Sequence, residues 1–230
     1  RRSMLGIIGA MKIETDSLIA EMNNVEKVNA GAFVFSQGEI CGKKVVVCEC
    51  GIGKVFSASA TALMIEKFGV SELINVGVAG GKKPLSQGDV VIAEKTVQHD
   101  YDATPDGLSL GQVHGFDSPY FNCDNGLVSR LDAIMNDMKI RHKIGVVASG
   151  DCFVSSKEKA SAISERFGAI AYDMESAAIN QICEVQKVKF VSLRAISDNG
   201  DDEAVKSFYE FVTAAAKTAI DVLRRLIEEM

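Results

Sequence analysis

The segment AIAYDMESAA, residues 169–178, joins a short strand to a helix and places two carboxylates at the junction. Residues 169–171 are typical of a strand. From Met174 onward apolar residues recur at helical spacing, with little room for a solvated face near the helix start. We therefore expect Glu175 to be half buried. Because a buried carboxylate is costly without a binding partner, Glu175 is the first candidate for a functional group.

Strand and helix patterns alternate along the rest of the chain. Short strands are predicted at 4–10, 72–78, 88–97, 143–149 and 189–196, together with a hairpin formed by 32–40 and 44–50. Helices are predicted at 11–23, 55–68, 127–138, 157–167 and 203–229. This alternation predicts an α/β fold in which a central, mixed, twisted sheet is flanked by helices on both faces.

Composition limits the domain count and the classes of partner. The 230 residues contain 3 Pro, no Ser/Gly-rich tract and no internal repeat, so we expect one domain over 4–230, with residues 1–3 a cloning remnant. A net charge of -6 argues against nucleic acid as a main partner. No apolar run is long enough to cross a bilayer or to act as a signal segment, so we expect no membrane partner.

Cysteine usage indicates the compartment. The 6 cysteines lie mostly inside apolar segments rather than at the loop spacings of a disulfide framework, which favours a reducing, cytoplasmic setting. Cys48 and Cys50 could form half of a metal site. No second Cys or His pair completes it, so no metal is expected.

Several polar or glycine-rich segments follow directly after predicted strands. Glu14, the turns after Cys50 and Val78, Phe153, Glu175 and Asp198 all fall there. In α/β folds ligands bind beyond the carboxyl ends of the strands, so this placement predicts a small-molecule pocket with three acids and no metal. The turn GIGK, 51–54, lacks the Walker pattern, and no GxGxxG occurs, so no nucleotide cofactor is expected.

Each of these residues also has a simpler interpretation. From spacing alone Glu14 is better explained as a solvated glutamate on a polar helix face. Asp198 could form an Asx turn or cap the last helix, for which Asp201 and Asp202 are at least as well placed. Phe153 could stack on a planar ligand or plug the core.

The longest irregular segment runs from 99 to 122. Loops of this length are usually lids, binding loops or contact surfaces. Its His99, Asp100 and Asp102 could suggest metal ligands, but turn capping and hydrogen bonding explain them more simply.

Five of the turns together resemble the nucleoside phosphorylase/nucleosidase superfamily, and most of all its bacterial methylthioadenosine/S-adenosylhomocysteine nucleosidases. They are GIGK (51–54), GVAGG (77–81), SGDCF (149–153), DMESAA (173–178) and RAISD (194–198). The resemblance covers the chain from Met4 onward. It implies a cofactor-free hydrolase that breaks the N-glycosidic bond of 5'-thioadenosines, acting as a homodimer with the 99–122 loop reaching the partner's pocket.

The resemblance also implies a role for individual residues. Asp198 matches the acid that protonates adenine at N7, Glu175 the acceptor of the ribose hydroxyls, and Glu14 the carboxylate that activates the attacking water. The matching adenine contacts are Phe153, Val154 and Ser197, beside Asp198. The apolar contacts around the ribose and the alkylthio group are Met11, Ile52, Val78, Met174 and Phe208.

Two other functions stay open from the sequence. A phosphorylase would share the fold, but the segment 74–81 carries none of the basic residues that bind phosphate in such relatives. A non-catalytic nucleoside-binding protein would have no need of a proton donor. Val78 stands where Ser is common, and 104–108 lacks the aromatic residues of several relatives, so the preference for the 5'-substituent is open.

Overall fold

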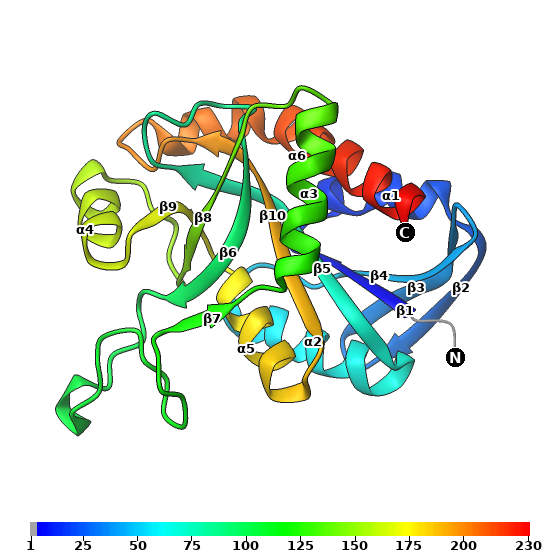
Figure 1. Cartoon of the computed structure of the whole chain (residues 1–230), viewed down its shortest axis with the longest axis horizontal. Helices are drawn as coiled ribbons and strands as arrows, with labels where there is room; N and C mark the ends of the chain where they lie inside the picture. Colours follow the sequence, from blue (N-terminus) through cyan, green and yellow to red (C-terminus); the bar gives the residue numbers. More distant parts are fainter. Residues whose placement is uncertain (1–3) are drawn as a thin grey trace.

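The computed structural model describes residues 4–230, and the expectation that residues 1–3 are a cloning remnant lies outside this range. The described residues form a ten-stranded mixed sheet (Figure 1). Its strands lie in the order β10-β6-β8-β9-β5-β1-β4-β3-β2, with β7 paired to β6. The strands are β1 (Met4–Gly9), β2 (Asn23–Ala30), β3 (Phe33–Ile40), β4 (Lys43–Glu49), β5 (Val70–Gly81), β6 (Val90–Gln98), β7 (Tyr120–Asn122), β8 (His142–Ser149), β9 (Ala169–Asp173) and β10 (Lys189–Asp198).

Two long strands, β5 and β10, form the middle of this sheet. They run parallel and in register from the pair Glu72–Lys189 to the pair Ala79–Ile196. The register then shifts, which sets Asp198 beside Gly80. Because β10 also pairs with β6, and the end of β5 pairs with β9, the strands β5, β10, β6, β8 and β9 close into a ring.

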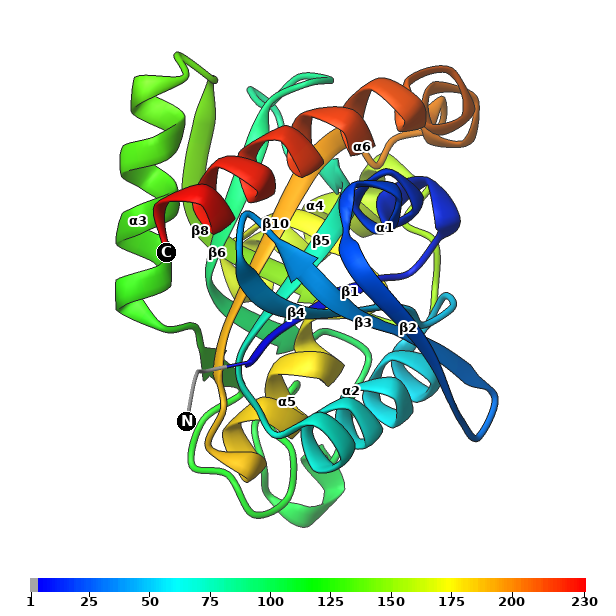
Figure 2. The ribbon, with the colours of Figure 1, turned by 90° about the vertical axis from the view of Figure 1, so that its right-hand side faces the viewer.

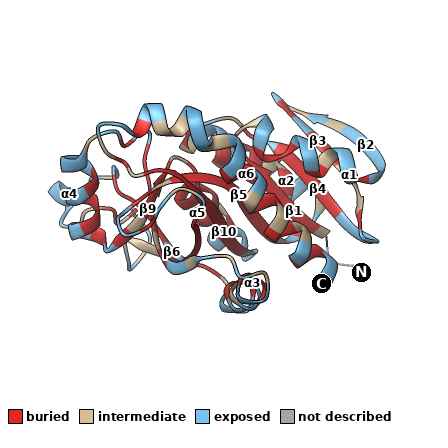
Figure 3. Cartoon of the chain, turned by 90° about the horizontal axis from the view of Figure 1, so that it is seen from above, coloured by how far each residue is buried: buried red, intermediate tan, exposed pale blue. Residues whose placement is uncertain are grey.

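Helices cover both faces of the sheet, as predicted. They are the 3₁₀ helices η1 (Lys12–Glu14) and η2 (Thr104–Asp106), and the α-helices α1 (Asp16–Glu21), α2 (Lys54–Phe68), α3 (Asn125–Asp137), α4 (Lys157–Phe167), α5 (Ser176–Gln186) and α6 (Ala204–Glu229). Figure 2 shows α2 and α5 side by side on one face, and α6 with α1 on the other. Viewed from above, the central strands are buried, while β2 at the edge of the sheet and the outer faces of the helices are exposed (Figure 3).

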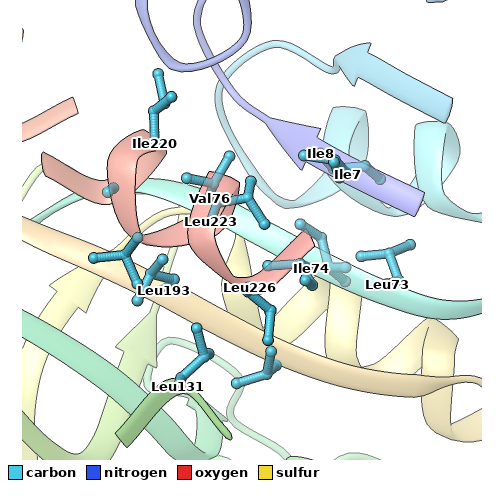
Figure 4. Close-up of a cluster of buried hydrophobic side chains, with 14 of the residues drawn as sticks. Ile7, Ile8, Leu73, Ile74, Val76, Leu131, Leu193, Ile220, Leu223 and Leu226 are labelled. Carbon is cyan, nitrogen blue, oxygen red and sulfur yellow. The ribbon is translucent and has the colours of Figure 1, made fainter. Parts of the chain in front are cut away.

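The core between α6 and the sheet explains why the last helix is the longest. Leu223 and Leu226 of α6 are fully buried against Val76 of β5 and Leu193 of β10 (Figure 4). Apolar residues recur along α6 at helical spacing, so one continuous stripe meets the sheet. This packing holds α6 across the sheet, with its first turns at the carboxyl ends of the strands.

Most predicted elements are confirmed, and the errors lie near the N-terminus and in the long loop. The helix predicted at 11–23 was wrong in extent, since a 3₁₀ turn and a short α1 replace it and Asn23 already begins β2. β2 was missed because NNVEKVNA is mostly exposed and shows no apolar alternation. The 99–122 loop contains η2 and β7.

Candidate functional site

A cavity of about 530 Å³ opens at the carboxyl ends of the strands. All eleven residues singled out from the sequence line it: Met11, Glu14, Ile52, Val78, Phe153, Val154, Met174, Glu175, Ser197, Asp198 and Phe208. They come from the exits of β1, β4, β8 and β9, from β5 and β10 themselves, and from α6. Residues spread over almost the whole chain therefore meet in one pocket.

Glu14 is a buried acceptor and not the solvated surface residue that its spacing favoured. Its side chain is 1% exposed. Oε2 accepts from the backbone N–H of Ala10 (2.6 Å) and Met11 (2.9 Å), and Oε1 accepts from that of Val78 (3.2 Å). Burial raises the pKa of Glu14, while the nearby Arg194 and these three N–H groups oppose the increase. A tight turn after β1 thus holds a carboxylate against β5.

Glu175 is buried more deeply than the predicted half, at 4% exposed. Its Oε1 accepts from the backbone N–H of Gly53 at 3.0 Å, and its Oε2 lies 3.7 Å from Nη2 of Arg194. Burial raises the pKa of Glu175 to about 7, with Arg194 opposing the change. Gly53 has φ of 102°, which favours glycine, so the GIGK turn brings its backbone to a neighbouring element as expected.

Arg194 lies beneath the cavity, and the sequence predicted no role for it although it belongs to the motif RAISD. It is 1% exposed, and its Nε lies 2.9 Å from Oδ2 of Asp173. The guanidinium also donates to Asn75 Oδ1 and to Ser176 Oγ (3.1 Å). A buried guanidinium requires such partners. The usable signal was an arginine within the apolar strand KFVSLRAISD, together with Asn75 in ELINVGV.

Asp198 forms the Asx turn considered from the sequence and also faces the cavity. It is 2% exposed and lines the cavity. Its Oδ1 also accepts from Gly200 N–H at 2.9 Å in an Asx turn, and its Oδ2 accepts from Ser197 Oγ at 2.8 Å. Burial raises the pKa of Asp198, which favours the protonated form. The capping alternative fails because α6 begins after Glu203, whose N–H donates to Asp201.

The apolar end of the cavity is formed by aromatic rings. Phe153 is 42% exposed, so it is not a core plug. Phe208 meets it edge to face, with ring centroids 5.7 Å apart. Beside such a pair of rings a planar, partly apolar ligand finds both stacking and edge contacts.

The charged side chains that line the cavity are all carboxylates. Four carboxylates line it, those of Glu14, Asp173, Glu175 and Asp198. Within residues 4–230, no Lys, Arg or His is among the lining residues. The same part of the chain holds no group of three His, Cys, Asp or Glu placed to bind a metal ion. The site suits a ligand that develops positive charge.

Comparison with known proteins decides the family. A model of the phosphorylase superfamily matches residues 4–228. The nucleosidase named for 5'-methylthioadenosine and S-adenosylhomocysteine from Oceanobacillus iheyensis is 38% identical over 228 residues, covering 98% of this chain and 99% of the relative. The chain belongs to the 5'-methylthioadenosine/S-adenosylhomocysteine nucleosidase family of the phosphorylase superfamily.

Solved structures of this nucleosidase family match over the whole fold. The enzyme from Neisseria meningitidis, in complex with methylthio-immucillin-A, superimposes with a TM-score of 0.96 at 37% identity, covering 99% of this chain and 100% of its own. A structure described as futalosine hydrolase of Helicobacter pylori gives 0.95 at 35% identity, covering 100% and 99%. The predicted nucleoside phosphorylase-like fold is confirmed.

Proposed function

We propose that this chain is a nucleosidase that hydrolyses the N-glycosidic bond of 5'-methylthioadenosine and S-adenosylhomocysteine, releasing adenine and a 5-thioribose product. Full-length relatives at 38% and 37% identity carry this activity in their names. One observation carries the choice of hydrolysis. The cavity is lined by four carboxylates and, among the described residues, by no cationic side chain. A phosphate nucleophile would meet like charge there, whereas water would not.

The proposed chemistry assigns proton transfer to two carboxyl groups. Adenine is a poor leaving group as an anion, so Asp198 donates a proton to its N7 as the bond breaks. The raised pKa of Asp198 supports this role, because it keeps more of the acid protonated. Glu14 binds and activates the attacking water.

The sugar carries the developing positive charge. As the bond to adenine breaks, the ribose becomes oxocarbenium-like. The negative charges of Glu14, Glu175 and Asp173 stabilise this positively charged transition state. In this proposal Glu175 accepts hydrogen bonds from the ribose hydroxyls, and these bonds strengthen in the transition state. Arg194, paired with Asp173, keeps the cluster of acids positioned from below.

Apolar residues supply the remaining contacts of the proposal. Phe153 stacks on adenine, while the backbone of Val154 and the Ser197 hydroxyl read its edge. Ile52, Met174 and Phe208 surround the ribose and the 5'-thio group, with Met11 and Val78. Because Val78 contributes only its backbone N–H to Glu14, the 5' end of the pocket is less polar than a serine would make it. This favours alkylthio substituents.

We further propose that the active form is a homodimer of this single nucleosidase unit, 4–230, in the cytoplasm. Val55 and Phe56 in the first turn of α2 are 76% and 55% exposed, next to Ile52 at the cavity, and a second copy would cover them. The segment between β6 and β7 extends away from the sheet, where it can reach that copy (Figure 1). All six cysteines are free, which fits a reducing compartment. Within residues 4–230, no helix is long and apolar enough to span a membrane.

A substrate panel tests the proposed function. Release of the purine base is measured by chromatography in phosphate-free buffer. The substrates are methylthioadenosine, S-adenosylhomocysteine, 5'-deoxyadenosine and aminofutalosine. We expect turnover of the two thioadenosines. Binding of adenine without turnover of any nucleoside would establish the non-catalytic alternative instead. Turnover of aminofutalosine alone would move the substrate assignment towards the function named for the Helicobacter relative.

A further inference from the structure

A thiol and an imidazole meet in the wall of the cavity and have no part in the proposed hydrolysis. Cys152 lines the cavity and is partly exposed. Its Sγ lies 3.8 Å from Nε2 of His99, within hydrogen-bonding distance for sulfur. His99 follows β6 and Cys152 follows β8, and these strands are parallel neighbours paired to their last residues, Gln98 and Ser149. The sheet itself therefore brings the two side chains together.

The surrounding contacts fix this arrangement. The backbone N–H of His99 donates to the backbone oxygen of Ser149 at 2.9 Å. The His99 ring lies so close to Gly150 that a Cβ on Gly150 would overlap Nε2 of the ring. On the next residues, Asp151 N–H donates to Asp100 Oδ2 at 2.8 Å, and Asp100 pairs with Lys54 at 2.7 Å. The base and the thiol therefore sit on two strand exits that are tied to each other.

The imidazole is in the form that can take a proton. Burial lowers the pKa of His99, and the neighbouring Lys159 and Lys54 act in the same direction against Asp100 and Asp173. A neutral His99 accepts at one ring nitrogen. By contrast, burial raises the pKa values of Cys48, Cys50, Cys123 and Cys183 and makes their thiols inert.

We propose that Cys152 and His99 form a nucleophile–base pair, and that Cys152 covalently captures soft carbon electrophiles that enter the cavity. With a haloacetamide the sulfur–carbon bond forms as the carbon–halogen bond breaks and halide leaves. The thiol proton passes to Nε2 of His99 and then to water. Since Phe153 is the next residue, the adduct occupies the aromatic end of the cavity. The same pair would anchor a purine-like ligand that carries an electrophilic carbon.

Labelling of the full-length native protein tests this pair, with Cys41 as an internal control. Cys41 is exposed at the turn between β3 and β4, and among the described residues no hydrogen bond joins it to a His. The protein is treated with iodoacetamide at pH 7, and the rate at each cysteine is read by peptide mass mapping. We expect Cys152 to react roughly tenfold faster than Cys41, since the typical gain of about 10²-fold from a positioned base is reduced by its lower exposure. Equal or slower reaction at Cys152 would overturn the proposal.

Two further arms separate the pair from general accessibility. His99→Gln should slow labelling of Cys152 while leaving Cys41 unchanged in the same sample, which also controls for folding. Activity should fall in step with labelling of Cys152, and Cys152→Ser should lose none of its own activity on treatment. An unchanged Cys152 rate in His99→Gln, or inactivation of Cys152→Ser, would contradict the proposal.

Adenine protection places the thiol relative to the ligand. Adenine should slow labelling of Cys152 and not of Cys41, with its binding measured by calorimetry in the same buffer. Bound adenine without protection would contradict the placement of Cys152. If adenine does not bind, the proposed function fails, while the comparison of Cys152 with Cys41 still decides the present inference.

Discussion

At the scale of single residues, four buried carboxyl groups at the cavity have different hydrogen-bond and ion-pair partners. Glu14 accepts three backbone N–H groups, Asp173 pairs with Arg194, Glu175 has one N–H and a more distant guanidinium, and Asp198 meets a hydroxyl and an N–H. Burial raises the pKa of Glu14, Glu175 and Asp198 in each case. In the proposed mechanism, these chemically alike groups serve as a water-activating base, a sugar-binding group and an acid.

Asp198→Asn tests the proton donor. Asparagine retains the Oδ1 acceptor for Gly200 N–H, so the turn should persist while the acid is lost. We expect kcat for adenine release to fall by at least about 10²-fold, the usual contribution of a positioned general acid. Asp201→Asn is the matched control on the same loop, because its side chain only accepts from Glu203 N–H. Wild-type kcat in Asp198→Asn would show that another group supplies the proton.

Glu175→Gln tests whether the sugar contact acts in the transition state. The amide oxygen can still accept from Gly53 N–H, but it carries no charge to stabilise an oxocarbenium-like ribose. We expect a larger loss in kcat than rise in KM. Steady-state kinetics with methylthioadenosine measures both. Poor binding with normal turnover would mean that Glu175 serves only ground-state binding.

The pKa of Glu175 also predicts a pH dependence of stability. Its value of about 7 in the folded protein lies above the ordinary 4.5, so the folded state holds the proton more tightly than the unfolded chain. This contribution is fully present below pH 4.5 and is lost as pH rises to about 7. The free energy of unfolding relative to Glu175→Gln should therefore fall by up to about 3 kcal/mol between pH 4.5 and 8, at 1.36 kcal/mol per pKa unit. Urea unfolding at pH 5 and pH 8 measures most of it, and an increase would contradict the assignment.

At the scale of elements, β5 shows how a strand can leave room for a site. Gly77 lies where the buried Arg194 and Glu14 approach the strand most closely. A Cβ there would overlap Nη1 of Arg194 and lie 2.7 Å from Oε1 of Glu14. The absence of a side chain at one position of β5 therefore lets two charged groups from other elements meet.

Gly77→Ala should remove activity as well as stability. Overpacking of this kind typically costs about 1–3 kcal/mol and displaces the groups that it touches. Gly42→Ala is the control: a Cβ there meets nothing within 4 Å, and only its φ of 74° is strained, at about 1–2 kcal/mol. Both variants are assayed at a temperature where circular dichroism shows them folded. Full activity of Gly77→Ala would show that the spacing is not critical.

The sequence predicted the elements with clear periodicity and missed those without it. The helix predicted at 157–167 is confirmed to the residue, because its buried residues recur at helical spacing. β2 is polar and exposed, and only its pairing with β3 makes it a strand. The site residues could be chosen from strand exits and family motifs. The burial of Glu14 could not be predicted from the sequence, because it depends on the register of β1 with β5.

At the scale of the whole molecule, exposed apolar side chains beside the cavity argue for a second subunit. Val55→Lys on α2 should lower the dimer population, since Val55 is the more exposed member of the patch and a lysine there would be buried on association. Ile144→Lys on β8, at 41% exposed, is the matched control on a strand that lies apart from α2 (Figure 2). Sedimentation velocity reports the mass of each variant. A dimer of unchanged stability in Val55→Lys, or a monomeric wild type, would contradict the proposed interface.

In the proposed reaction water, and not phosphate, attacks the sugar in a cavity lined by carboxylates. The most direct measurement is ³¹P NMR of a reaction containing methylthioadenosine and inorganic phosphate, with adenine release followed in parallel samples with and without phosphate. We expect the same rate of adenine release in both samples and no phosphorus resonance other than that of inorganic phosphate. Adenine release that requires phosphate, together with a new sugar 1-phosphate resonance, would contradict this expectation.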